Sequence, residues 1–257
     1  MKRIVKEWFF RKWYWYVSRT DKNAEVLFMN FGYQNDNEKV ELSEEDEKNR
    51  FSIQLYHKLA SFTDLADKNI CEIGCGRGGG LSFIHKNFKP KSSKGLDLNH
   101  RAAKFCKDFY KHPGLSFVQG DAQNLPFDDK SFDVVLNVES SHRYPSFQTF
   151  LSEAYRTLDI GGYLLLTDFR FDYDYEKMQN DISSSDFEIV HHEIITPNVV
   201  AALTADDARK RELVNRLVPF FIRKIALNFA GAIDSDTYNK FKHGGYIYFI
   251  YVLKKVK

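Results

Sequence analysis

The chain has 257 residues, of which 43% are hydrophobic, which is enough to bury the core of one domain with an elaboration. Its 37 basic and 35 acidic residues leave a formal charge of +2, which argues against a field that would gather nucleic acid, so we expect no nucleic-acid partner. Its three cysteines, Cys71, Cys75 and Cys106, are an odd number without paired metal-ligand spacing, which argues against a disulfide framework and a zinc site.

Residues 1–50 predict an amino-terminal arm that covers the functional site. The arm begins with Met1 to Arg19, which is rich in Trp, Tyr and Phe, but charged residues interrupt every apolar run. Neither a signal peptide nor a membrane span fits this pattern, so we expect a cytoplasmic protein without a transmembrane segment. The aromatic and basic side chains can rest at a membrane interface or cover a cofactor, and we favour the intramolecular role.

Residues 51–257 predict one α/β domain. A helical pattern from Ile53 to Ala60 is followed by a strand at Asn69–Ile73 that leads into a glycine-rich turn. The elements expected beyond the turn are helices at Gly79–Asn87, Arg101–Tyr110 and Pro145–Leu158, and strands at Lys94–Leu98, Leu115–Gln119, Phe132–Val138 and Tyr163–Thr167. Such alternation is typical of a parallel sheet with helices on both faces.

The last third of the chain predicts an antiparallel hairpin added to that sheet. Its two strands are expected at Phe187–Ile195 and Tyr246–Leu253. The segment between them, about residues 197–243, is helical in pattern and is predicted to be an inserted cap rather than part of the core. Apolar residues repeat every four positions there, although Pro219 should end or kink a helix that runs through them: Leu213, Leu217, Phe221 and Ile225.

The glycine-rich turn predicts a ligand that contains a nucleoside. Gly74, Gly76 and Gly78 permit positive φ and a close approach of the ligand to the main chain, and the helix beyond begins with unpaired N–H groups. Asp97 lies at the distance expected of an acid that binds ribose. Both a dehydrogenase and a methyltransferase fit these features, so the turn alone does not decide between them.

Three further features favour S-adenosylmethionine, with S-adenosylhomocysteine as product. Glu72 stands where an acid would attract a sulfonium and an amino group but repel a pyrophosphate. Gly120-Asp121-Ala122 ends the third strand, and its carboxylate can accept the adenine amino group. The terminal hairpin suits the Rossmann-like sheet of class I methyltransferases. The alternative is that these acids only cap helices, but their ordered occurrence favours the cofactor.

Residues after the fourth and fifth predicted strands are the catalytic candidates, because ligands bind beyond the carboxyl ends of an open parallel sheet. His142 can act as a general base near neutral pH, and Asp168 can orient its ring and stabilise the imidazolium. The pair suits methylation of a hydroxyl by in-line displacement, for which no metal is needed. The alternative role of His142 is to cap the helix that follows.

Segments along nearly the whole chain match one known group: Phe28–Tyr33, Asn49–Phe51, Gln54–His57, Gly74–Gly80, Gly95–Asn99, Phe117–Ala122 and Glu139–His142. They resemble the phthiotriol/phenolphthiotriol dimycocerosates methyltransferases. This resemblance implies an O-methyltransferase with a large apolar acceptor, such as a lipid, polyketide or similar secondary metabolite. Distant relatives that methylate sugar hydroxyls use a histidine and an aspartate that correspond to His142 and Asp168. Arg143 departs from the pattern of the named family.

The motifs and the resemblance together give one predicted set of cofactor-binding residues: Tyr33, Glu72, Gly74, Gly76, Gly78, Asp97, Leu98, Asn99, Gly120, Asp121, Ala122, Asn137 and Glu139. Two other functions stay open. A sterol-type C-methyltransferase would use Glu139 to manage a carbocation on an apolar acceptor. A non-catalytic module that binds the cofactor is less consistent with the retained acids. The sequence leaves the acceptor, the oligomeric state and any peripheral contact with a membrane undecided.

Overall fold

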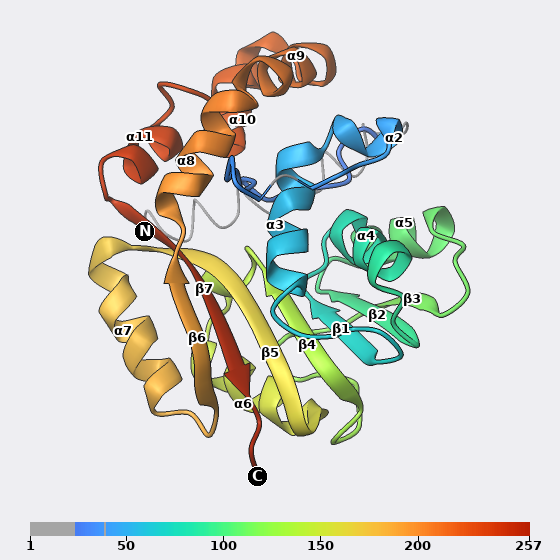
Figure 1. Cartoon of the computed structure of the whole chain (residues 1–257). Coiled ribbons are helices and arrows are strands. Elements are labelled where there is room, and N and C mark those ends of the chain that lie inside the picture. Colours follow the sequence, from blue (N-terminus) through green and yellow to red (C-terminus); the bar gives the residue numbers. More distant parts are fainter. Residues whose placement is uncertain (1–23, 39) are drawn as a thin grey trace.

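The computed structural model describes residues 24–38 and 40–257, and seven strands form a single sheet at its centre (Figure 1). The strand order is β3-β2-β1-β4-β5-β7-β6. The first five strands run parallel, whereas β7 is antiparallel to both of its neighbours. The strands are β1 (Asn69–Ile73), β2 (Ser92–Asp97), β3 (Leu115–Gln119), β4 (Phe132–Val138), β5 (Leu158–Phe171), β6 (Glu188–Ile194) and β7 (Tyr246–Lys254). The predicted parallel sheet with a terminal antiparallel hairpin is confirmed.

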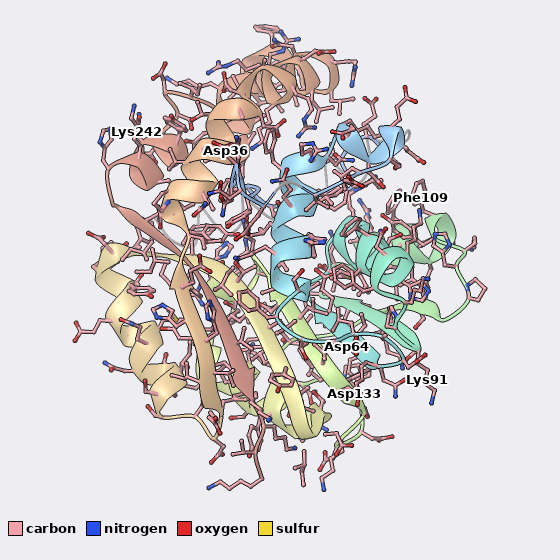
Figure 2. All side chains as sticks on the ribbon, in the orientation of Figure 1. Asp36, Asp64, Lys91, Phe109, Asp133 and Lys242 are labelled. Carbon is pink, nitrogen blue, oxygen red and sulfur yellow. The ribbon has the colours of Figure 1, made fainter. Side chains whose placement is uncertain are left out.

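Helices cover both faces of the sheet, because strand residues alternate between two buried clusters. Leu165 packs on the face covered by α3 (Arg50–Ala60), α4 (Gly79–Phe88) and α5 (His100–Phe109). Leu164 and Leu166 pack on the opposite face, under α6 (Phe147–Thr157) and α7 (Asp172–Ser183). Figure 2 shows side chains filling the space between the sheet and these helices. The two layers make the central strands apolar on both sides, as parallel strands require.

Two helices and the length of β5 differ from the prediction. β5 extends beyond Tyr163–Thr167 at both ends, because Leu158 pairs with Phe132 of β4 and Phe171 pairs with Tyr246 of β7. The helix α7 was not expected, since its sequence is largely polar and its apolar face consists of few residues. The helix α2 (Glu44–Glu47) is a single turn capped by Ser43, which is too short to produce an apolar period.

The helical segment between β6 and β7 lies at the end of the sheet where the parallel strands finish. It leaves and re-enters the sheet beside the end of β5, because Phe171 pairs with Tyr246 at the start of β7. Its elements are α8 (Thr196–Ala205), α9 (Asp207–Leu217), η2 (Phe220–Ile222), α10 (Arg223–Ala230) and α11 (Asp236–Lys242). Below, this segment is called the cap.

The four-residue repeat of the cap does not form one apolar stripe. The helix α9 ends at Leu217, two residues before Pro219, as the proline predicts. Because the chain turns there, the two halves of the repeat belong to different helices. Phe221 is exposed. The buried cluster between α9 and α10 is made by other residues: Val214, Val218 and Ala226.

The described part of the amino-terminal arm is bonded to both the core and the cap. Tyr33 N donates to Phe51 O of α3 over 2.9 Å. Gln34 is paired twice with Asn198 of α8, through Gln34 N to Asn198 O and through Asn198 Nδ2 to Gln34 O. The aromatic start of the arm, Met1 to Arg19, lies outside the described residues, so its predicted role has no structural description.

Candidate active site

The glycine-rich turn joins β1 to α4 with positive φ at Gly74 (78°) and Gly76 (53°). A Cβ added at Gly74 would lie 2.2 Å from Ser140 Oγ, so the turn is packed against the segment that follows β4. At Gly76, apart from the two chain neighbours, Met29 Sδ is the only atom of the described residues within 4 Å of such a Cβ, at 3.7 Å. The turn is therefore open at Gly76, where a ligand can approach the main chain. The arm lies beside this opening.

The end of β2 holds three predicted cofactor residues next to the turn. Asp97 Oδ2 accepts a hydrogen bond from Gly76 N over 2.9 Å, and Asp97 Oδ1 accepts one from Asn99 N over 2.8 Å. Burial raises the pKa of Asp97, and these two N–H donors lower it in part. Asn99 caps α5, and Leu98 is 65% exposed. A carboxylate has about four acceptor positions, so Asp97 can accept further donors from a ligand.

Two buried side chains at the ends of β1 and β4 have acceptor oxygens without a partner among the described residues. Glu72 Oε1 accepts from Tyr56 Oη over 2.7 Å, but Glu72 Oε2 has no donor. Burial raises the pKa of Glu72 to about 7. Asn137 Nδ2 donates to Ile73 O over 2.8 Å, whereas Asn137 Oδ1 has no donor. Buried acceptors of this kind are normally satisfied, so both oxygens fit a ligand that donates hydrogen bonds or carries positive charge.

The residues after β3 are placed less favourably for a ligand. Gly120 packs against Leu96, where an added Cβ would lie 2.5 Å from a methyl carbon. Asp121 is exposed, and its Oδ1 accepts from Gln123 N over 2.9 Å, as in a turn cap. Ala122 and Leu125 are buried in the core, so neither side chain offers free surface to a ligand. The second oxygen of Asp121 is the polar group left for a ligand.

Two predicted cofactor residues have other partners. The hydroxyl of Tyr33 donates to Glu38 Oε2 over 3.2 Å and lines a cavity of about 510 Å³ beside α3, with His57 and Lys58. Glu139 Oε1 accepts from Phe31 N and from Tyr248 Oη, each over 2.6 Å. The hydroxyl of Tyr33 therefore contacts Glu38 rather than the glycine-rich turn. Glu139 holds the arm through its hydrogen bond with Phe31 N. Local sequence could not reveal this, because both partners of Glu139 are remote in the chain.

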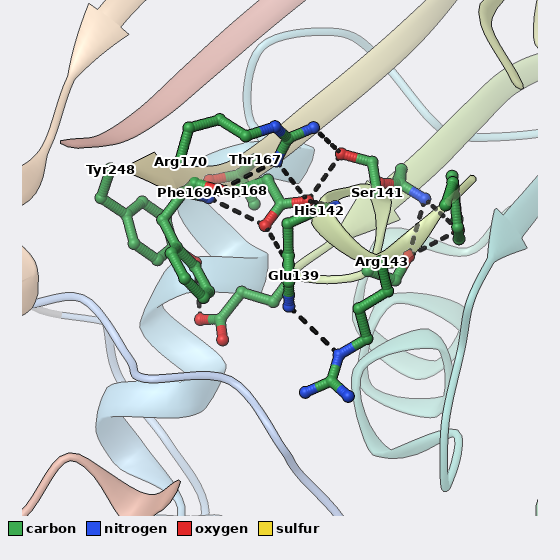
Figure 3. A network of polar contacts seen from close by, with 12 residues as sticks. Glu139, Ser141, His142, Arg143, Thr167, Asp168, Phe169, Arg170 and Tyr248 are labelled. Atoms are coloured by element: carbon green, nitrogen blue, oxygen red, sulfur yellow. Dashed lines mark hydrogen bonds and ion pairs between the residues drawn. The ribbon is translucent and has the colours of Figure 1, made fainter. Parts of the chain in front are cut away.

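His142 and Asp168 are in contact, as Figure 3 shows. His142 lies in the short helix η1 (Ser141–Arg143) after β4, and Asp168 lies in β5 beside it. His142 Nδ1 is 2.7 Å from Asp168 Oδ1, and His142 N donates to Asp168 Oδ2 over 2.9 Å. Asp168 is fully buried and also accepts from Ser141 Oγ over 2.6 Å. The aspartate therefore fixes both the ring and the backbone of His142.

Burial favours the neutral form of His142, and its two hydrogen-bond partners define one tautomer. Asp168 can only accept and Arg143 Nε can only donate, so Nδ1 carries the proton and Nε2 carries the lone pair. Burial lowers the pKa of His142; Asp168 opposes this, and Arg143 and Arg170 lower it further. Burial alone would raise the pKa of Asp168, but His142 and Arg170 hold it well below its usual range.

An aromatic wall stands beside the base. The ring of Phe169 lies 4.4 Å from the ring of His142, measured between centroids. Phe31 of the arm and Phe241 of the cap each lie 5.5 Å from Phe169, and Tyr246 lies 5.0 Å from it. The arm, the cap and β5 thus contribute to one apolar surface next to a polar base.

Sequence reasoning gave no role to three residues of this network, Ser141, Arg170 and Tyr248, although Ser141 and Arg170 lie in the segments after the fourth and fifth predicted strands. Arg170 Nη1 lies 3.2 Å from Asp168 Oδ2, and Arg170 Nη2 donates to Ser141 Oγ over 2.8 Å. The alternation of a strand gave a usable signal for Arg170, since residues two apart share one face. Ser141 stands next to His142 but its hydroxyl gave no signal of its own.

Within residues 24–38 and 40–257, no group of three or more His, Cys, Asp and Glu side chains is arranged to hold a metal ion. Over the same residues, no helix has both the length and the apolar character needed to cross a membrane.

Comparisons with known proteins identify the family of the chain. A family model described as "Methyltransferase domain" matches residues 71–166. The chain is 43% identical over 211 residues to a fatty-acid O-methyltransferase of Mycolicibacterium smegmatis, which covers 82% of this chain and 77% of the relative. It is 39% identical over 236 residues to a phthiotriol/phenolphthiotriol dimycocerosates methyltransferase of Mycobacterium tuberculosis, which covers 91% and 87%. Geranyl diphosphate C-methyltransferase from Streptomyces coelicolor A3(2), solved with S-adenosyl-L-homocysteine, has a similar fold, with a TM-score of 0.66 and 16% identity over 93% of each chain.

Proposed function

We propose that this chain transfers a methyl group to a hydroxyl oxygen of an apolar, lipid-like acceptor. The chain belongs to the family of class I S-adenosylmethionine-dependent methyltransferases. Two relatives are named for lipid-like acceptors, a fatty acid and phthiotriol or phenolphthiotriol dimycocerosates, which supports the apolar character of the acceptor. The aromatic wall of Phe31, Phe169 and Phe241 beside His142 supports an apolar acceptor. Such a wall would bury the chain of the acceptor and leave its polar end at the base.

The described residues fit the cofactor at the ends of β1, β2, β3 and β4. We assign the ribose hydroxyls to Asp97 and the adenine amino group to Asp121. The unpartnered oxygens of Glu72 and Asn137 fit the positive charge and the amino group of the methionine part. When bound, the cofactor supplies a methyl group that its sulfonium has already activated. The chain must then bind and orient the acceptor, exclude water and remove one proton.

In this proposal His142 removes the proton of the acceptor. Nδ1 is held by Asp168, so the lone pair on Nε2 accepts the hydroxyl proton once Arg143 Nε, which donates to it over 3.1 Å, has moved aside. The imidazolium that forms is stabilised by the buried carboxylate 2.7 Å away. The contact between His142 and Asp168 is the single observation that carries this proposal. Residues 1–50 would act as an arm over the site, and the insertion at about 197–243 as a cap.

A second acceptor, a carboxylate, is favoured by Arg143. Its Nε lies 3.1 Å from His142 Nε2, so a cation stands where the reacting oxygen would bind. A carboxylate is ionised at neutral pH, needs no base, and pairs well with a guanidinium. The sterol-type C-methylation has less support, because Oε1 of Glu139 already binds Phe31 and Tyr248.

The test uses His142→Ala with labelled cofactor and two matched acceptors, a long-chain alcohol and the fatty acid of the same length. For a hydroxyl acceptor, turnover should fall by about 10²–10⁴-fold while cofactor affinity is kept. NMR of the product distinguishes an ether, an ester and a carbon-bound methyl. Methylation of the fatty acid alone, at an undiminished rate in the variant, would replace the hydroxyl by the carboxylate reading.

A further inference from the structure

The turn between α9 and α10 carries two adjacent aromatic side chains that face solvent. Phe220 is 80% exposed and Phe221 is 71% exposed, with ring centroids 5.6 Å apart and planes at 89°. Ile225, one turn further along, is 38% exposed. Single exposed apolar residues are common on protein surfaces, whereas an adjacent group of three marks a contact surface. We call Phe220, Phe221 and Ile225 the cap tip.

The cap tip is held by its own small core. Val214, Val218 and Ala226 form a buried cluster between α9 and α10. These two helices therefore pack together without using Phe220 or Phe221. Arg223 braces the turn from inside, with Nε donating to Val218 O over 2.9 Å and Nη2 donating to Asn215 O over 2.7 Å. The exposure of the two rings therefore does not result from poor packing, because the turn that carries them is packed and hydrogen-bonded.

The charge beside the cap tip has one sign. Between Glu212 and Asp234 the sequence contains Arg216, Arg223 and Lys224 and no acidic residue, whereas the whole chain has a formal charge of only +2. Lys224 is exposed, next to the tip. Arg216 is partly neutralised by Glu25 and by Glu212, which lies 3.6 Å away. An apolar tip with basic residues around it is complementary to an anionic lipid surface, where rings enter the interface and cations meet the headgroups.

We infer that the cap tip docks this protein reversibly on an anionic membrane surface. Figure 1 shows α9 and α10 at the end of the molecule opposite the chain's C-terminus, away from the sheet. A protein partner is the rival occupant, but lysine is depleted at protein interfaces and favoured at membrane surfaces. The inference concerns attachment and goes beyond the proposed reaction. It does not depend on which acceptor is methylated.

The experiment is co-sedimentation of the full chain with vesicles of phosphatidylcholine alone or mixed with phosphatidylglycerol. We expect binding to the anionic vesicles, which weakens as salt rises. The double variant Phe220→Ser with Phe221→Ser should lower this binding by about tenfold or more, because its apolar contribution is lost. Lys224→Glu should lower binding to anionic vesicles and leave binding to neutral ones unchanged. The control is Tyr173→Ser on α7, which removes an aromatic side chain that is as exposed as Phe221.

Three results would overturn the inference. The wild-type chain would fail to bind anionic vesicles, or the double variant would bind them as well as the wild type. Alternatively, the double variant would change the oligomeric state in gel filtration while vesicle binding stayed equal, which would make the tip a protein interface. Circular dichroism and binding of S-adenosylhomocysteine, measured for every variant, separate loss of docking from loss of fold or of the proposed function.

Discussion

Asp168 is fully buried, and its carboxylate accepts several hydrogen bonds. Such a carboxylate orients a histidine and does not itself exchange protons. Its Oδ1 receives the ring of His142 and the backbone N–H of Phe169, and its Oδ2 receives Ser141 and Arg170. A carboxylate in this position stays ionised throughout catalysis. Its contribution is to hold one tautomer of His142 and to stabilise the cation that forms.

The first prediction is that Asp168→Asn lowers turnover by about 10²–10⁴-fold, because an amide can present a donor to His142 Nδ1 and so favour the wrong tautomer. Affinity for S-adenosylhomocysteine should change little. Steady-state kinetics with a hydroxyl acceptor and calorimetry with the product measure the two effects. Asp181→Asn is the control, since Asp181 is also buried and paired, but with Lys177 on α7. Turnover near that of the wild type would refute the assigned role of Asp168.

The second prediction concerns Arg143, whose charge lowers the pKa of His142. In Arg143→Gln that pKa should rise. Because turnover needs the neutral ring, the rate increases with pH through this pKa, and the rising limb of the profile should move to higher pH. Turnover against pH for the variant, the wild type and a Lys107→Gln control on α5 tests this. A limb that stays in place, with a raised KM for a fatty acid, would instead indicate that Arg143 binds a carboxylate acceptor.

At the scale of residues, position after a strand was the useful signal. It predicted that His142 and Asp168 would meet. It did not predict that Glu139 binds Tyr248, because those residues are 109 positions apart and come together only through the pairing of β7 with β5. A side chain after a strand can face the ligand or a neighbouring element, and the sequence does not distinguish these cases.

At the scale of elements, a chain of polar contacts joins the cap, the arm and the sheet. Lys210 of α9 donates to Phe31 O over 3.4 Å, Phe31 N donates to Glu139, and Tyr248 of β7 donates to the same carboxylate. Burial raises the pKa of Glu139 to about 8, and burial lowers that of Lys210 to about 8. Glu139 therefore needs its donors, because burial penalises its charged form.

The third prediction is that Tyr248→Phe lowers the free energy of unfolding by about 1–3 kcal/mol, because it leaves a buried acceptor on Glu139 without one donor. Urea unfolding of the variant and the wild type measures the change. Tyr246→Phe is the matched control on the same strand, since the variant keeps the ring contacts that Tyr246 makes with Phe169, Phe171 and Phe241. Equal stability of the two variants would mean that the contact between Tyr248 and Glu139 contributes nothing to holding the arm.

The elements that the sequence predicted are those with a strong period and clear ends. The strands β1 and β4 were predicted with their observed ends, because apolar runs are bounded there by turn residues. The helix α7 was missed although Tyr175, Met178 and Ile182 are buried at helical spacing. Three apolar residues among many charged ones gave a weak period, and packing against β5 and β7 supplies the rest of its stability.

At the scale of the whole molecule, the alternation of strands and helices was enough to predict the sheet, but not the way in which arm and cap meet. Gln34 and Asn198 are 164 residues apart, and their pairing depends on where β6 and β7 place the cap. A ligand at the ends of β1, β2 and β4 would touch the centre of the sheet and the arm above it. Binding of such a ligand should therefore raise the stability of the entire fold.

The last prediction is that S-adenosylhomocysteine raises the melting temperature and that Asp97 carries much of this effect. At about 100 times its Kd a ligand adds about 2.7 kcal/mol, which corresponds to a rise of about 5–10 °C for a chain of this size. In Asp97→Asn the amide keeps one acceptor for Gly76 N but pairs poorly with a ribose diol, so the product should bind about 10–100-fold more weakly, and at the same concentration the rise should be about half or less. Comparing each variant with its own ligand-free state removes the effect of the substitution on the fold. Asp174→Asn on α7, an exposed acid outside the strand ends, should show the full rise. The same rise in Asp97→Asn as in the wild type, with equal Kd by calorimetry, would remove Asp97 from the cofactor site.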